Sequence, residues 1–211
     1  MSQHYILMAD IVKSSDKNAH YLMQDFKEFC SRISQRFHND FISPITITLG
    51  DEFQSVIRSL KAGVDIILFF EEDIIKEQKH FSLRYVLNFG EIETPLNNDA
   101  AYGMLGPGLL KARNALADLK ETNDRFFFSL GNQILSEKLN LIFRLYQMIV
   151  DNWQCKNLSL VGEFLRNRDY KAVAEAMNKD RSLMWRREKS LNISEYFDIK
   201  KLIEKEIDPN A

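Results

Sequence analysis

The segment Tyr5–Val12 constrains the fold more than any other part of the sequence. Its residues are apolar at odd and even positions alike, and Asp10 is the exception. A strand of this composition is buried on both faces, as central strands of helix-covered sheets are, because a strand with one face in water alternates between apolar and polar residues. The segment therefore predicts a central strand.

Strand and helix patterns alternate along the chain up to residue 130. Helical spacing of apolar residues predicts helices over 20–37, 60–79 and 106–120. Further strands are predicted at 44–49, 52–58, 83–89 and 125–130, the first two forming a hairpin through Gly50-Asp51 and the third ending at Gly90. This order predicts an α+β fold, ferredoxin-like, with a mostly antiparallel sheet and helices on one face.

From about Ser136 onward, helical spacing dominates and no convincing strand pattern occurs. We therefore predict a boundary near residue 132. Residues 1–132 would form an α/β sandwich domain, and residues 133–211 a small all-α domain that resembles a helix-turn-helix unit.

The composition excludes several classes of protein. A net charge of -2 excludes a uniformly basic nucleic-acid coat, so nucleic-acid binding would need a local patch. Cys30 and Cys155 lie too far apart for a metal knuckle, and the four histidines show no ligand spacing. No targeting or membrane-spanning segment is visible. We expect a bacterial-type cytoplasmic protein with no membrane partner.

Acidic residues mark one end of the predicted sheet. Asp10 ends the first strand, and Asp51 and Glu52 occupy the hairpin turn. Two carboxylates side by side repel unless a cation bridges them, and oxygen ligands suit Mg²⁺ or Mn²⁺. Two such ions about 4 Å apart orient phosphoryl transfer. The structural alternatives are a capping role for Asp10, ordinary turn chemistry for Asp51 and a supporting role for Glu52.

Two further groups would suit a nucleotide. The turn Lys13-Ser14-Ser15 offers backbone N–H groups at a helix start, which is a common phosphate cradle. Lys111 and Arg113 lie near the start of another helix, where the alternative is an ordinary solvated role.

The order of these short motifs resembles the SatD family of bacterial proteins over residues 5–120. The matching pieces are Ala9-Asp10-Ile11, Thr46–Gln54, Leu83-Arg84, Gly90-Glu91-Ile92 and Gly106-Pro107 with Ala112-Arg113. The same pattern is similar to class III nucleotidyl cyclase and GGDEF-type cores. That resemblance implies metal ligands at Asp10, at the backbone carbonyl of Ile11, and at Asp51 or, in the GGDEF variant, Glu52.

Two departures from the cyclase pattern bear on activity. Ile47 stands where cyclases carry a base-selecting Lys or Glu. Leu109 stands four residues before Arg113, where they carry an Asn that serves the transition state. Missing donors of this kind lower a charge-stabilised rate by several powers of ten. The resemblance therefore implies metal and nucleotide binding more than cyclisation.

The C-terminal part contains a helix, turn and helix pattern. The first helix follows Asp169, the turn is Asn178-Lys179-Asp180, and the second helix runs over 181–189. Asp169 and Asp180 are suitable N-caps. Residues 166–191 carry eight Lys or Arg against four Asp or Glu, a local charge of +4.

In a helix-turn-helix, early side chains of the second helix contact bases in the major groove. These would be Arg181, Ser182, Trp185 and Arg186, with Lys171 and Lys189 on phosphates. The alternative is a small bundle with a solvated basic face. A last amphipathic helix, 193–207, would pack on this bundle or form a dimer contact.

We hypothesise a cytoplasmic regulatory protein of the SatD type. A degenerate cyclase-like domain would sense a nucleotide or dimerise, and the helix-turn-helix would bind DNA, most simply as a homodimer. One alternative is an active Mg- or Mn-dependent nucleotidyltransferase or cyclase acting on a nucleoside triphosphate. Another is a non-catalytic interaction module.

Overall fold

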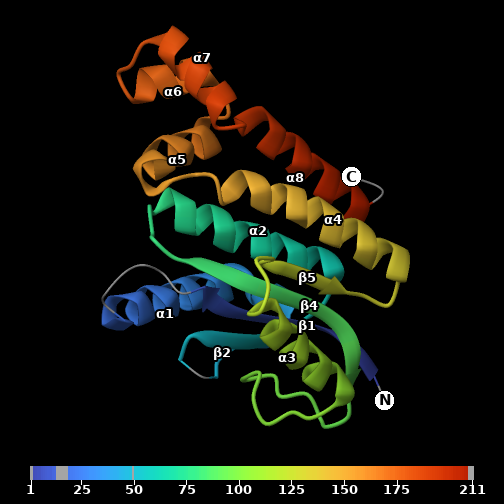
Figure 1. Cartoon of the computed structure of the whole chain (residues 1–211). Coiled ribbons are helices and arrows are strands. Elements are labelled where there is room, and N and C mark those ends of the chain that lie inside the picture. The colour runs from blue at the N-terminus through green and yellow to red at the C-terminus, as the bar shows by residue number, and fades with distance from the viewer. Residues whose placement is uncertain (1, 13–18, 49, 209–211) are drawn as a thin grey trace. The chain divides into compact units, whose positions relative to one another are not determined.

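The computed structural model describes residues 2–12, 19–48 and 50–208, and Figure 1 shows the order of the elements. The strands are β1 (Ser2–Val12), β2 (Phe41–Ile47), β3 (Glu52–Ile57), β4 (Ser82–Ile92) and β5 (Phe126–Ser129). The helices are α1 (Ala19–Arg36), α2 (Leu60–Lys76), α3 (Pro107–Leu119), α4 (Gln133–Val150), α5 (Leu158–Asn167), α6 (Tyr170–Ala176), α7 (Arg181–Ser190) and α8 (Ile193–Ile207). Short 3-10 turns occupy His38–Asp40 and Cys155–Asn157.

The chain forms two compact units. The first comprises the residues up to Phe70 together with Phe81–Asn140, and the second comprises Glu71–His80 together with Leu141–Ala211. Helices α2 and α4 contribute one part to each unit. The sheet belongs to the first unit, and helices α5 to α8 belong to the second. The domain boundary near residue 132 stays a prediction.

The first unit is built on a five-stranded mixed sheet in the order β2-β3-β1-β4-β5. Neighbouring strands are antiparallel except β4 and β5, which run parallel. Strand β1 lies in the centre, where Leu7 pairs with Ser55 on one side and with Leu87 on the other. The predicted strand and helix order and the mostly antiparallel sheet are confirmed.

Helices cover both faces of the sheet, so the prediction of helices on one face is wrong. Residues Ile6, Met8 and Val86 pack with the inner side of α3, which carries Leu109, Ala112, Leu116 and Leu119. The neighbouring Leu87 points the other way and lies against Gly63 of α2. On that second face Phe53 stacks on Phe26 of α1 and on Phe70 of α2, with ring centroids 6.2 and 5.3 Å apart. A central strand with two apolar faces requires this double cover.

Gly90 does not end β4, as the sequence predicts, but lies within it opposite His4 of β1. A side chain here would collide with α3, because a Cβ on Gly90 would lie 2.7 Å from Cα of Gly108. The Nδ2 of Asn88 also donates to the carbonyl of Gly108, at 2.9 Å. The glycine therefore serves a close approach of two backbones, not a turn.

The edge strand β5 is closed by a side chain of α4. The amide of Asn140 accepts from the N–H of Phe128 at 2.8 Å and donates to its carbonyl at 2.9 Å. A side-chain amide thus takes the place of a further strand at this position. Unpaired edges promote association between sheets, so Asn140 protects this one.

The second unit has an aromatic centre. Tyr196 of α8 packs against Tyr146 and Trp153, with ring centroids 5.6 and 5.1 Å apart. The Nε1 of Trp153 donates to the carbonyl of Leu191 at 2.8 Å. Helix α8 therefore packs within the helical unit, one of the two roles expected for residues 193–207. No helix among the described residues is long and apolar enough to cross a membrane.

Candidate functional site

The acidic end of the sheet centres on Asp10. Its side chain lies on the α3 face, because it shares the even register of Ile6 and Met8, and it is 1% exposed. The Nη1 of Arg84, its cross-strand partner in β4, donates to both carboxylate oxygens at 3.1 and 3.0 Å. The Nζ of Lys120, one residue beyond α3, lies 2.9 Å from Oδ2. Two cations of the chain thus neutralise one buried carboxylate.

Lys120 is held in its charged form by this site. The hydrogen bond to Asp10 raises its pKa most; burial works in the opposite direction. The negative charges of Asp10, Glu52 and Asp51 then raise the pKa further. The three acids that the sequence singles out therefore act together on one ammonium group, although that side chain is 46% exposed.

The hairpin acids occupy different positions. Glu52 pairs with Asp10 across β3 and β1, is buried, and accepts from the hydroxyl of Thr48 at 3.3 Å. Asp51 is exposed, and its backbone carbonyl accepts from the N–H of Ile11 at 3.0 Å. The structure thus brings Asp10 and Glu52 side by side and places Asp51 next to Ile11 through the backbone.

As placed, these residues do not fit the divalent cation that the cyclase resemblance implies. The described residues contain no group of three His, Cys, Asp or Glu side chains arranged to hold a metal ion. An ion at Asp10 would have to displace Lys120 and compete with Arg84, which already bond to the carboxylate. The metal site at Asp10, Ile11, Asp51 and Glu52 stays a prediction from the sequence.

The residues predicted to hold a nucleotide do not form one described site. Lys13, Ser14 and Ser15 lie outside the described residues. Lys111 and Arg113 are both exposed on α3 but line two different hollows, one beside Phe127 and one beside Leu105. Nucleotide binding by these residues stays a prediction.

Arg84 and Lys120 are the residues of this site that sequence reasoning missed. A signal for Arg84 was present. Asp10 and Arg84 are the only charged residues in the predicted strands 5–12 and 83–89, and a buried charge requires a partner. No comparable signal exists for Lys120. Its contact depends on where α3 ends relative to the strand.

In the second unit, α6 and α7 lie where the sequence predicts two short helices. The side chain of Asp169 accepts from the N–H of Lys171 and caps α6, and that of Asp180 accepts from the N–H of Leu183 and caps α7. Asn178 in the connecting turn has φ of 51°, a left-handed conformation that Asn tolerates. Hydrogen bonds from Ser182, above all, and from the N–H of Leu183 lower the pKa of Asp180, so the cap stays charged.

The two helices share a small apolar contact. Val173 and Ala174 of α6 and Met184 of α7 are buried. Arg187, at a position where apolar residues are common in such motifs, is half-buried and donates to the side-chain oxygen of Asn157 at 2.6 Å. That bond explains how the charge is accommodated.

The opposite side of α7 is polar and basic. The exposed side chains of α7 are Arg181, Ser182, Leu183, Trp185, Arg186, Lys189 and Ser190. Among the described residues, the charge of Arg186 acts on Asp180, the N-cap of the helix, whereas no ion pair is formed by Arg181 or Lys189. Tyr170 of α6 joins Arg181, Ser182 and Trp185 around a shallow hollow of about 390 Å³. This face can bind an anionic, partly aromatic partner.

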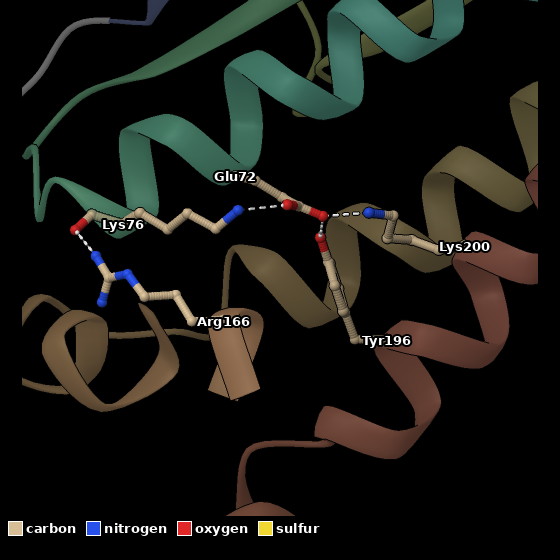
Figure 2. A network of polar contacts seen from close by, with 5 residues as sticks. All are labelled: Glu72, Lys76, Arg166, Tyr196 and Lys200. Carbon is tan, nitrogen blue, oxygen red and sulfur yellow. Dashed lines mark hydrogen bonds and ion pairs between the residues drawn. The ribbon is translucent and has the colours of Figure 1, made fainter. Parts of the chain in front are cut away.

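A second polar cluster lies inside the helical unit (Figure 2). Glu72 accepts hydrogen bonds from Lys76 at 2.8 Å, from the hydroxyl of Tyr196 at 3.1 Å, and from Lys200. Burial alone would raise the pKa of Glu72, but the charge and hydrogen bond of Lys200, followed by those of Lys76, bring the net pKa below its ordinary value. The cluster joins α8 to the last turns of α2, which is a structural role.

The family model for SatD matches residues 5–207 of this chain. The chain belongs to the SatD family. The match covers the sheet except for the first residues of β1, and it covers the C-terminal helices to the end of α8. No curated protein sequence matches this SatD-family chain.

Two solved structures that are similar to this chain are cyclases. A bacterial light-regulated adenylyl cyclase is 12% identical over 60% of this chain and 74% of its own, with a TM-score of 0.42. The catalytic core of a rhodopsin-guanylyl cyclase with converted specificity, in complex with ATPalphaS, is 16% identical over 55% of this chain and 73% of its own, with a TM-score of 0.35. At these scores the likeness supports no conclusion about activity.

Proposed function

We propose that this SatD-family protein is a regulatory protein that binds DNA through α7. The observation that carries the proposal is the composition of the exposed side of that helix. Three exposed cations, Arg181, Arg186 and Lys189, flank Ser182 and Trp185. The opposite side of α7 is buried on α6 through Met184. A phosphate backbone is the polyanion that such a face fits.

The residues divide by their position along α7. Arg181 and Ser182 lie in its first turn, and Trp185 and Arg186 follow one turn later, so all four face the same side. Early residues of a recognition helix reach base edges in the major groove, where Arg is suited to guanine and an apolar surface to the thymine methyl group. Lys171 on α6 and Lys189 at the end of α7 are exposed and suit phosphates.

The capping of α7 supports this role. Asp180 fixes the first turn of the helix through the N–H of Leu183 and also accepts from the hydroxyl of Ser182. Trp185 is 49% exposed, so a large apolar surface of this side chain is available to a partner. Of the residues proposed to read bases, Arg181 and Ser182 lie in this capped first turn.

The sheet unit, on this proposal, is a degenerate cyclase-like domain. The carboxylate of Asp10 is neutralised by Arg84 and Lys120, which supports a structural role for the acid. Leu109, at the position where the resemblance implies a transition-state donor, is buried in the apolar cluster under α3. Both observations favour regulation over turnover of a nucleotide.

Binding is tested by selecting DNA from a random-sequence library with the full chain and titrating the recovered sequence by fluorescence anisotropy. We expect one sequence class to bind at least about a thousandfold more tightly than random DNA. The logarithm of the affinity should fall linearly with the logarithm of the salt concentration. Failure to enrich any sequence, together with equal affinity for all DNA, would contradict the proposal.

A further inference from the structure

A groove runs along the outer side of α3, in the first unit, next to Phe127 of the edge strand β5. Its volume is about 370 Å³. The helical residues that line it are Pro107, Leu110, Lys111, Asn114, Ala115 and Asp118. These positions follow i, i+3, i+4, i+7, i+8 and i+11, so they form one continuous stripe. The stripe is distinct from the inner side of α3, which packs on the sheet.

The surface around this groove is apolar and exposed. Leu110 is 61% exposed and also lines a second hollow of about 150 Å³, together with Leu105, which is 70% exposed. Leu110 therefore stands as a ridge between two depressions. Two large apolar side chains so close together on an exposed surface are suited to a contact with another molecule.

The charges of the groove are arranged so that a second copy of the chain can complement them. Lys111 lies near one end and Asp118 near the other, seven residues apart on the same stripe, and neither forms an ion pair with another described residue. A two-fold axis near Asn114 and Ala115 would place Lys111 of each copy against Asp118 of the other. The ridge of Leu110 would at the same time enter the depression of the facing copy. The surface is thus its own complement, as a two-fold interface requires.

We propose that two copies of this chain pair through α3 in antiparallel orientation, with two reciprocal contacts between Lys111 and Asp118. The proposal is independent of DNA binding by α7, because it uses residues of the first unit alone. It also gives α3 a second role besides covering the sheet.

Charge reversal of the full chain tests the arrangement, with the monomer–dimer equilibrium measured by sedimentation equilibrium. Lys111→Glu places a glutamate against Asp118 of the facing copy, and Asp118→Lys places a lysine against Lys111, twice in each dimer. Each single variant should raise the dimer dissociation constant about tenfold or more. The double variant K111E/D118K should restore the dissociation constant of the parent to within about threefold.

A mixture of the two single variants tests the pairing of Lys111 with Asp118 most directly. In a heterodimer of one K111E copy and one D118K copy, one contact joins the two introduced side chains, a glutamate and a lysine of opposite charge, and the other joins the original Lys111 and Asp118. Both contacts are attractive, so the mixture should form a heterodimer more tightly than either variant alone. Lys27→Glu on α1, which makes the same change of charge on an exposed residue far along the chain, is the control and should leave the equilibrium unchanged. Circular dichroism confirms that each variant is folded.

Three results would overturn the proposal. One is a monomer at every concentration reached, which would leave the groove to a different partner. Another is a dimer that neither single reversal weakens. The third is a pair of weakened single variants whose mixture and double variant stay weak. A dimer that follows the charge pattern in all four samples supports it.

Discussion

The Nζ of Lys120 lies 2.9 Å from Oδ2 of Asp10, where the ammonium shares the carboxylate with Arg84. Asp10 and Glu52 are neighbouring acids at this end of the sheet, and a positive charge beside them lowers their mutual repulsion. Arg84 and Lys120 of the chain itself supply that charge. In the structure, Asp10, Arg84 and Lys120 form an ion-pair network at this end of the sheet.

Divalent cations should have little effect on this network. We expect millimolar Mn²⁺ or Mg²⁺ to leave the Tm of the protein unchanged, because the carboxylate of Asp10 is already neutralised. Asp10→Asn should lower the free energy of unfolding by about 1–3 kcal/mol, since it leaves Arg84, whose side chain is 15% exposed, without its partner; half-exposed Lys120 contributes less. Differential scanning calorimetry measures both. Glu121→Gln, on an exposed residue, is the control. A rise in Tm with Mn²⁺ that Asp10→Asn removes would show a metal site instead.

The sheet unit should not turn over nucleotides. Incubation of the protein with ATP, GTP, CTP or UTP and either Mg²⁺ or Mn²⁺ should yield no cyclic or pyrophosphate product. The reason is that Leu109 has no hydrogen-bond donor to offer a transition state and is buried in the apolar core. Chromatography of the nucleotide pool checks this. A product that disappears in both Asp10→Ala and Asp51→Ala would restore the alternative of an active nucleotidyltransferase.

The side chain of Asn140 should control the edge of the sheet. Asn140→Leu removes the donor and the acceptor that pair with Phe128, so we expect a loss of about 1–3 kcal/mol in the free energy of unfolding and a greater tendency to aggregate. Asn140→Asp keeps an acceptor for the N–H of Phe128, so its free energy of unfolding should lie between those of the parent and of Asn140→Leu. Urea titration and light scattering measure the effects. Equal stability of all three proteins would show that the contact is dispensable.

Much of the fold was accessible from the sequence because apolar periodicity reports burial directly. The stripes of α1 and α3 and the doubly apolar β1 are such cases. The faces of the sheet were not correctly assigned, although β1 already implied cover on both sides. The end of β4 was misplaced at Gly90 because a glycine needed for a close helix contact looks the same in sequence as a glycine in a turn.

The candidate site was only partly accessible. A hairpin beside the first strand predicts that Asp10 and Asp51 approach each other, but the cross-strand partner of Asp10 is Glu52. The sequence did not predict that Arg84 and Lys120 bind Asp10. The contact of Lys120 depends on the length of α3 and on its packing across the sheet. Pairings between residues so far apart in the chain leave no local pattern.

Acid should weaken the cluster around Glu72. The folded pKa of this carboxyl lies below its ordinary value of 4.5, so its contribution to stability is complete above that pH and is lost as the pH falls through the folded pKa. At about pH 7, Glu72→Gln should lower the free energy of unfolding by about 1–3 kcal/mol, and the difference from the parent should shrink toward about pH 3. Urea titrations across this range measure it, with Glu204→Gln as the control. A difference that stays constant with pH would contradict the assignment.

DNA binding by α7 is the central claim, and paired substitutions on that helix test it most directly. With the selected DNA sequence and a random sequence of equal length, fluorescence anisotropy gives both affinities for each variant of the full chain. Arg181→Ala should weaken the specific complex by about 1–3 kcal/mol and reduce the ratio of specific to random affinity. Lys189→Ala should weaken both complexes alike and reduce the salt slope by about 1. The control Lys27→Ala should leave both affinities unchanged. If Arg181→Ala and Lys189→Ala also leave both affinities unchanged, α7 does not bind DNA.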